Sequence, residues 1–253
     1  MNTSVPWSDL AFFYIIVVIP LVILWMMDLK DLSKDLAISI VRMSVQLLVI
    51  GFYLQTVFDF DNLALNLVWL VAMTTIAAVT SAGRAKMPRL RSAVPLTAAV
   101  LIAMVPVLLM FIFILSRPEP WYSARLMIPI AGMLLGNALG SLVIALRRFN
   151  IRTPEDKEHL ELLTTMGATK LEARQTLIKT ALRASASPII ASMATLGLVA
   201  LPGMMTGQIL GGSDPLEAVQ YQIAIMLGIS ATQALAIILA LHFSVHLDDE
   251  FQN

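Results

Sequence analysis

The residues with the most unusual chemical potential lie in one stretch, LPGMMTGQILGGSDP, from Leu201 to Pro215. It holds four glycines and two prolines in fifteen residues, and no lysine, arginine or histidine. Three chemistries fit this composition: a phosphate-cradling loop, a soft-metal site on the thioethers of Met204 and Met205, or a break between two membrane helices. A nucleotide-binding P-loop ends in a lysine that contacts the phosphates. None follows these glycines, so the phosphate loop is excluded.

Polar side chains within apolar segments form a second set of candidates, because polar groups at membrane depth are costly and commonly functional. Arg42 and Gln46 are four residues apart and share one helix face. Arg42 either extends to lipid phosphates or lines the inner mouth of a pathway. For Asn137 and Gln233, an interhelical hydrogen bond and a substrate contact both remain open. The candidate pathway or gate residues are Arg42, Gln46, Asn137, Met204, Met205, Thr206, Gly207 and Gln208.

Ligands for a tightly bound metal are scarce. The chain has no cysteine, which excludes thiolate sites and disulfides. His242 and His246 are spaced i, i+4 near acidic residues, and they either hold a divalent metal or lie on a solvated helix end. No carboxylate lies in the middle of an apolar segment, which disfavours a proton-coupled or sodium-coupled carrier and an aspartate intramembrane protease.

Composition places all these residues in a membrane protein. Hydrophobic residues make up 58% of the 253 and charged residues 13%, with a mean hydropathy of +0.82. Soluble domains carry about 25% charge, and about 20 apolar residues cross a bilayer as a helix. We expect an all-α fold in one transmembrane domain, residues 1–253. Its seven transmembrane helices are predicted at Leu10–Met27, Leu36–Phe58, Leu63–Ala82, Ala93–Leu115, Leu126–Leu146, Ser187–Met205 and Tyr221–Phe243.

The basic residues predict the orientation of these spans. Fifteen of the seventeen lysines and arginines fall at one membrane side, and only Arg117 and Arg125 fall at the other. Because basic residues accumulate in cytoplasmic loops, the N-terminus is expected outside and the C-terminus in the cytoplasm. The cell inner (plasma) membrane is the expected location, and no nucleic-acid partner is implied because the charges are confined to loops.

A polar segment, residues 147–186, separates the fifth and sixth predicted spans. Thr153 and Pro154 are typical of a helix start, and Gly167 is typical of a left-handed helix stop. Thr169 and Glu172 have the spacing of a capping box that opens a second helix. That helix is amphipathic and is expected to end near Arg183 and to lie against the membrane surface. The segment is therefore predicted to be a cytoplasmic helical hairpin, either a bare surface element or a docking site for another protein.

Two groups of glycines recur at a spacing of four, the spacing of close helix packing. The residues are Gly132, Gly136 and Gly140 in one group, and Gly203, Gly207 and Gly211 in the other. A seam within the chain and a seam between two copies of it are both compatible with this pattern.

The hairpin sequence resembles the EAA loop of ABC importer permeases, in which an acidic residue precedes a glycine by six positions. Glu161 and Gly167 match that spacing, whereas Leu162 and Leu163 replace the two alanines. In such permeases the loop fits a groove of the ATP-binding subunit. The resemblance implies coupling contacts for Glu161, Leu162, Leu163, Gly167, Ala168 and Thr169.

A closer resemblance covers nearly the whole chain. The stretch from Glu161 to Met226, with RMSVQLLVIGFYL at Arg42–Leu54 and GMLLGNALG at Gly132–Gly140, resembles the FetB-type (YbbM-type) ABC permease family, which includes bacterial putative iron exporters and plant relatives associated with aluminium tolerance. The resemblance implies a homodimeric permease among membrane lipids, with a separate ATP-binding subunit and iron export. This chain is expected to bind no cofactor and to catalyse no reaction, with ATP held by the partner.

Other functions remain open at this stage. The plant relatives leave a sugar nucleotide or another small solute as an alternative substrate of an ABC exporter. A secondary transporter would need ionisable groups at mid-membrane, and these are scarce here. A sensor or assembly subunit would account for the hairpin but not for the polar helix faces.

Overall fold

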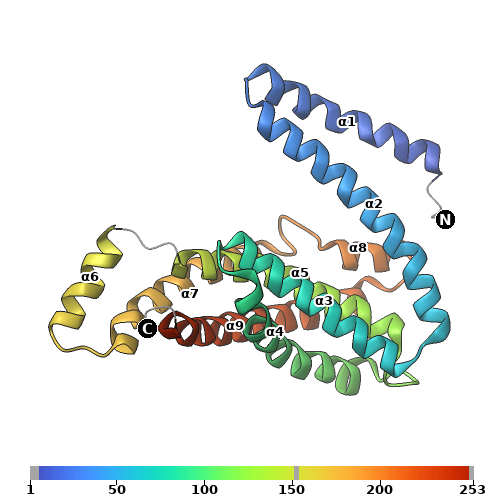
Figure 1. Cartoon of the computed structure of the whole chain (residues 1–253). Helices are drawn as coiled ribbons and strands as arrows, with labels where there is room; N and C mark the ends of the chain where they lie inside the picture. The colour runs from blue at the N-terminus through green and yellow to red at the C-terminus, as the bar shows by residue number, and fades with distance from the viewer. Residues whose placement is uncertain (1–5, 151–153, 251–253) are drawn as a thin grey trace. The chain divides into compact units, whose positions relative to one another are not determined.

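The structure is a computed structural model that describes the backbone of residues 6–150 and 154–250. Side chains are described for the same residues except 89, 90, 154, 155, 157, 170, 171 and 245–250. Every regular element in this part of the chain is a helix, as the sequence predicts. The chain divides into two compact units, Met1–Phe60 and Asp61–Asn253, and each is described by itself (Figure 1).

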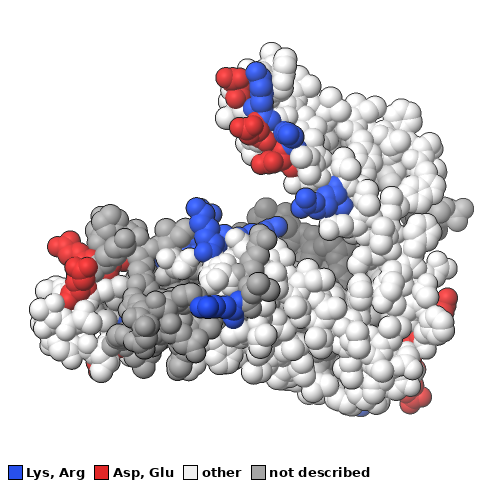
Figure 2. All heavy atoms as spheres, in the orientation of Figure 1, with Lys and Arg blue, Asp and Glu red and all other residues white. Residues whose placement is uncertain are grey.

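The first unit is a hairpin of two apolar helices, α1 (Trp7–Met26) and α2 (Lys30–Phe60). The Tyr14 hydroxyl donates to Ser44 Oγ at 2.6 Å, and Ser33 Oγ donates to the Leu21 carbonyl at 3.0 Å. No residue of α1 is buried within the described structure. Most of the charged side chains seen on this unit gather near the end where the two helices join (Figure 2). Apolar helices exposed to this extent require lipid or another chain around them.

The second unit contains the remaining helices. They are α3 (Leu63–Arg84), α4 (Arg89–Met110) with its π-helical continuation η1 (Phe111–Ser116), α5 (Ala124–Asn150), α6 (Pro154–Thr165), α7 (Lys170–Thr195), α8 (Gly203–Leu210) and α9 (Pro215–Glu250).

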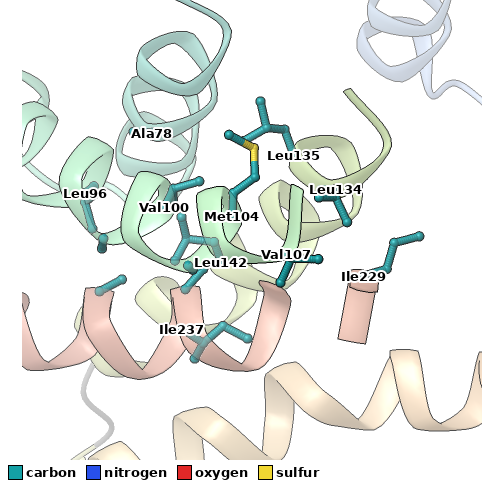
Figure 3. Close-up of a cluster of buried hydrophobic side chains, with 14 of the residues drawn as sticks. Ala78, Leu96, Val100, Met104, Val107, Leu134, Leu135, Leu142, Ile229 and Ile237 are labelled. Atoms are coloured by element: carbon teal, nitrogen blue, oxygen red, sulfur yellow. The ribbon is translucent and has the colours of Figure 1, made fainter. Parts of the chain in front are cut away.

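The core of this unit forms where α3, α4, α5 and α9 meet (Figure 3). Met104 of α4, Leu142 of α5 and Ile237 of α9 lie in it and are almost completely buried. Alanines such as Ala78 and Ala131 are fully buried beside them. Small side chains allow neighbouring backbones to approach closely, which is how helices pack in lipid, where the hydrophobic effect between helices is weak.

Polar contacts at one end of this bundle join the starts of α3 and α5. The carboxylate Oδ1 of Asp61 accepts from the backbone N–H of Ala124 at 2.6 Å. The buried Asn66 side chain donates to the Tyr122 carbonyl at 2.8 Å. Asn62 caps α3 by accepting from Ala64 N at 2.9 Å. The bonds from Ala124 N and Ala64 N satisfy amides that a helix N-terminus leaves open. The Asn66 bond joins α3 to the segment just before α5.

Among the described residues, six helices are long and apolar enough to cross a membrane: α1, α2, α3, α4 with η1, α5 and α9. They coincide with six of the seven predicted spans. The remaining predicted span, Ser187–Met205, is not one helix, and that prediction is corrected here. The helix stops at Thr195, Gly197 takes a left-handed φ of 83°, and α8 starts only after the extended Pro202.

The predicted amphipathic helix with an end near Arg183 also differs from the structure. It continues without interruption to Thr195 as α7, although Pro188 lies inside it. Ala173, Leu177, Ala181 and Ser185 recur every four residues and are buried, on the helix that packs against α5 and α9. The prediction of a helix on the membrane surface is therefore corrected: the apolar face that suggested lipid contact packs against protein.

Candidate coupling hairpin and intramembrane polar sites

A bidentate salt bridge joins the hairpin of α6 and α7 to the end of α5. Arg148 of α5 donates through Nη1 to Asp156 Oδ2 at 2.7 Å and through Nη2 to Oδ1 at 3.2 Å. Both side chains are largely shielded from solvent. A guanidinium–carboxylate pair with two hydrogen bonds fixes the orientation of the two side chains as well as their distance. It therefore holds the start of α6 against the end of α5. The predicted cap Thr153 lies outside the described residues, and α6 begins at Pro154 as expected.

The turn between α6 and α7 is held by backbone bonds that its glycine permits. Gly167 has a φ of 90°, a conformation that costs residues with a Cβ free energy. Its N–H donates to the Thr164 carbonyl at 3.1 Å, and the N–H of Ala168 donates to the Leu163 carbonyl at 3.0 Å. This pair of bonds is the Schellman motif that ends a helix. The predicted left-handed stop is confirmed.

The predicted capping box is confirmed directly after the turn. Thr169 N donates to Glu172 Oε2 at 2.8 Å, and Glu172 N donates to Thr169 Oγ1 at 3.3 Å. Hydrogen bonds from Thr169, through its side chain first and its backbone second, lower the pKa of Glu172. The carboxylate therefore remains ionised at neutral pH and also suits the positive end of the helix. A helix stop and a helix start within six residues make this a tightly determined turn.

One side of the hairpin tip remains uncovered in the chain. Leu162 is 57% exposed and Met166 is 75% exposed, and both are large apolar side chains. Glu161, Gly167 and Thr169 are also exposed, whereas Leu163 and Ala168 are half-buried. Acidic side chains gather over α6 (Figure 2). The six predicted coupling residues thus lie together at the tip, and the structure adds Met166, which could have been found as the apolar residue directly before the helix-stopping glycine.

Asn137 and Gln233 meet at the interface of α5 and α9. The Gln233 side chain is buried and donates through Nε2 to the Asn137 carbonyl at 2.8 Å and to Ser141 Oγ at 3.1 Å. The Asn137 side chain is exposed and donates to the Met133 carbonyl of its own helix at 2.8 Å. Gln233 therefore makes the interhelical bond, and the Asn137 amide points away from it and stays a candidate for a pathway.

Arg42 and Gln46 lie one helical turn apart on α2, and both are exposed. They belong to the first unit, whereas the other pathway candidates belong to the second. Their two interpretations, contact with lipid phosphate and a pathway role, remain as the sequence left them.

Leu201–Pro215 forms the short helix α8 and its two boundaries. Thr206 Oγ1 donates to the Pro202 carbonyl at 3.1 Å. Gly212, with φ of 99°, ends the helix by the same pair of bonds as Gly167. Asp214 then caps α9 by accepting from Leu216 N at 2.8 Å. The stretch is therefore a helix between two defined stops rather than an open loop.

The side chains of α8 contact different parts of the second unit. Met204 packs against the hydrophobic core of the second unit. Met205 lines a pocket beside α9. Gln208 is half-buried, and its Oε1 has no hydrogen-bond partner among the described residues. The two methionines predicted to act together thus lie in different surroundings.

The repeated glycines differ in whether another atom lies close to the position of a Cβ. A Cβ on Gly132 would meet Met73 Cε at 3.5 Å, and one on Gly211 would meet the Gly207 carbonyl at 3.2 Å. Gly136, Gly140, Gly203 and Gly207 have no such neighbour within 4 Å in the described structure. Gly136 and Gly140 are also exposed, so no described helix of the second unit packs against that face of α5.

The histidine pair receives no support as a metal site. His242 is exposed and its ring lies 6.2 Å from that of Phe243, whereas the His246 side chain lies outside the described residues. Within the described part of the chain there is no cluster of three or more histidine or acidic side chains arranged to hold a metal ion.

Long apolar helices, exposed apolar faces and internal polar pairs define a helical multi-pass membrane protein. Residues 7–247 match the family model described as "Uncharacterised protein family (UPF0014)", and the chain belongs to this family. The family resemblance read from the sequence motifs is thereby confirmed.

Three relatives illustrate the range of the family. The chain is 35% identical to "UPF0014 membrane protein YjkA" of Bacillus subtilis, over 82% of this chain and 81% of that protein. It is 35% identical to "Protein ALUMINUM SENSITIVE 3" of Arabidopsis thaliana, over 84% and 76%. It is 30% identical to "Probable iron export permease protein FetB" of Escherichia coli, over 84% and 81%. No solved structure matches the chain.

Proposed function

We propose that this chain is the membrane subunit of an ABC transporter that exports a metal ion, with iron as the substrate, and that a separate subunit supplies the ATP hydrolysis. The observation that carries the coupling is the uncovered apolar tip on a turn held by defined bonds at both sides. The iron substrate is supported by the name of one relative, a probable iron export permease.

The hairpin is held in a fixed conformation, as a segment that transmits a displacement must be. The bonds around Gly167 and the capping box of Thr169 hold the turn, and the Arg148–Asp156 pair fastens α6 to α5. From this turn α7 runs as one helix of 26 residues, a length of about 39 Å at 1.5 Å per residue. A displacement of the tip by an ATP-binding subunit is therefore transmitted along α7 to α5 and α9, against which it packs.

The orientation follows from the same proposal. The hairpin and fifteen of the seventeen basic residues lie on the cytoplasmic side, with the N-terminus outside and the C-terminus inside. The second half of α7, the segment 196–202 and α8 then make a broken seventh crossing. Non-helical backbone in a membrane needs a cover of protein or a water-filled cavity, and a second copy of the chain supplies that cover.

The exposed glycine face of α5 is part of the proposed homodimer. Gly136 and Gly140 lie one turn apart and have open space beside them in the described chain. Such a face allows a helix of another copy to approach closely. The transport path is proposed to run along this seam, where the exposed Asn137 side chain also lies.

Co-purification tests the coupling hairpin. The wild-type chain is expected to retain a candidate ABC ATP-binding subunit of the same organism during affinity purification in detergent. Leu162→Asp places a charge on the exposed tip and should reduce the retained ATPase at least tenfold. Leu216→Asp is the matched control, because Leu216 is a similarly exposed leucine, 67% exposed, in the first turn of α9. Equal retention by the two variants would overturn the docking role of the hairpin.

A further inference from the structure

The exposed face of α5 ends in a basic residue. Asn137, Gly140, Ile144 and Arg147 follow one another at spacings of three or four residues, so they lie on one face of the helix. All four are exposed in the described structure. The proposed transport path runs along Asn137 and Gly140, and Arg147 belongs to the last turn of α5. Arg147 therefore lies at the cytoplasmic end of that path.

The turn between α3 and α4 adds two further positive charges beside this end. The Asn150 side chain donates through Nδ2 to the Ala85 carbonyl at 3.2 Å and to the Lys86 carbonyl at 3.3 Å. Arg84 and Lys86 flank Ala85, and both are exposed. Arg147 precedes Asn150 by three residues, a spacing that places two Cβ atoms about 5–6 Å apart. The three long basic side chains therefore begin close to one another.

No acidic residue balances these charges on the helices that carry them. The sequences of α3, α4 and α5 contain neither aspartate nor glutamate. Asp156, at the start of α6, is already paired with Arg148. On the face shown in Figure 2, acidic side chains lie over α6, apart from basic side chains of the same unit. A surface with one sign of charge raises the local concentration of solutes of the opposite sign.

We propose that iron enters this path as an anionic complex, in which a carboxylate ligand already surrounds the ion, and that Arg147, Arg84 and Lys86 capture the complex. This inference rests on the iron export proposed above and specifies the chemical form of its substrate. Guanidinium groups bind carboxylates through two parallel hydrogen bonds, which suits a polycarboxylate chelate. The oxygen ligands of the chelate travel with the metal, so the path does not have to supply them.

A bare iron ion fits this path less well. It would first pass the positive charges at the cytoplasmic end, which repel a cation. It would then move along a face of α5 that offers the Asn137 amide but no carboxylate, and an ion taken from water without a charged partner is strongly disfavoured. Within the described residues there is also no cluster of histidine or acidic side chains that could hold the ion in transit.

The chemical form of the substrate is tested in inverted membrane vesicles that contain this chain and the proposed ATP-binding subunit. ATP-dependent uptake is measured for three forms of ⁵⁵Fe: iron(II) with ascorbate, iron(III) with [¹⁴C]citrate, and iron(III) as the uncharged tris-maltolate complex. The citrate complex should have a kcat/KM about tenfold or more above the other two. ⁵⁵Fe and ¹⁴C should enter together in a constant ratio, and KM should rise with ionic strength, because salt screens exposed charges.

Variants of the basic residues test the capture step. Arg147→Gln should raise KM for the citrate complex about three- to tenfold and leave kcat unchanged, whereas Arg147→Lys keeps the charge and should stay within about threefold of the wild type. The double variant with Arg84→Gln should raise KM further and flatten its dependence on ionic strength. Arg183→Gln is the matched control, because Arg183 is an exposed arginine on α7, outside this face of α5, and it should leave KM unchanged.

The possible outcomes separate this inference from the function on which it rests. Equal kcat/KM for iron(II) and the citrate complex, or uptake of ⁵⁵Fe without ¹⁴C, would overturn the inference while ATP-driven iron export stands. Absence of ATP-dependent uptake of all three forms would contradict both.

Three further results would overturn the capture role of the basic residues. The first is an unchanged KM in the double variant. The second is loss of the ATP-binding subunit from Arg147→Gln during co-purification, which would assign this arginine to docking. The third is a KM that depends on the anionic lipid content of the vesicles in the wild type but not in Arg147→Gln, which would assign it to lipid phosphate.

Discussion

At the scale of single residues, the strongest predictions concern the turn of the hairpin. The identities of Gly167, Thr169 and Glu172 predict a helix stop and a helix start, and the structure contains both. They could be predicted because each interaction joins residues at most five positions apart and depends on backbone rules alone. Whether the Asn137 amide faces α9 or away from it could not be predicted, because a single rotation of α5 about its axis decides it.

The capping box makes the turn sensitive to acid but not to changes near neutral pH. Glu172 has a folded-state pKa below its ordinary value of 4.5. A lowered pKa stabilises the fold above the unfolded-state pKa, and this contribution is lost as the pH falls through the folded-state pKa. The Thr169 amide proton, which donates to Glu172 Oε2, should therefore titrate in NMR spectra with a midpoint below 4.5. Glu172→Gln should abolish the titration. A midpoint at or above the ordinary value would show that the box does not form.

At the scale of helices, the contact of α4 and η1 with α9 depends on one glycine. A Cβ on Gly228 would lie 2.7 Å from Phe111 Cε2 and 3.1 Å from Val107 Cγ1. Phe111 is buried, and its ring must shift toward the hollow beside it before the added methyl group fits. Gly228→Ala is expected to destabilise the protein by about 1–3 kcal/mol, the usual cost of overpacking. Thermal unfolding in detergent measures the change.

The control for that substitution is a helical glycine with free space. Gly51 of α2 is exposed, and a Cβ added to it would have no neighbour within 4 Å among the described residues. Gly51→Ala should leave stability unchanged or raise it by about 0.5–1 kcal/mol, because alanine favours helix. If both substitutions have the same effect, the close contact between Phe111 and Gly228 is not present in the protein.

Helix prediction failed at α7 for a physical reason. Hydropathy divides a helix where its composition changes from polar to apolar, near Arg183, but the backbone continues as long as each residue can be helical. α7 therefore extends from the polar hairpin to Thr195. The break falls instead at Gly197, whose positive φ the sequence pattern did not single out, and at the extended Pro202, which lies in the stretch Leu201–Pro215 that the sequence offered as a candidate break. The six predicted spans that coincide with helices were predictable because each contains one long apolar run.

At the scale of the whole molecule, the amino-acid composition alone predicted the class of protein, a helical multi-pass membrane protein. A chain with 13% charged residues and long apolar runs exposes in its structure the apolar faces that a bilayer accepts. The division into two units and the core shared by α3, α4, α5 and α9 could not be predicted. They depend on contacts between helices distant in sequence, and apolar helices with similar patterns can pack in many pairings. The family match then shows that one relative of the chain is named as a permease.

ATP-driven iron accumulation in inverted membrane vesicles that contain this chain and the proposed ATP-binding subunit tests the central claim most directly. The wild type should accumulate iron only with ATP. Gly167→Pro cannot adopt the φ of 90° at the turn, because proline fixes φ near −65°, and should lower the rate at least tenfold at equal amounts of chain in the membrane. Gly167→Asn, which tolerates the left-handed conformation, should retain transport. ATP-dependent iron uptake that is absent in the wild type, or equally fast with Gly167→Pro, would contradict the account.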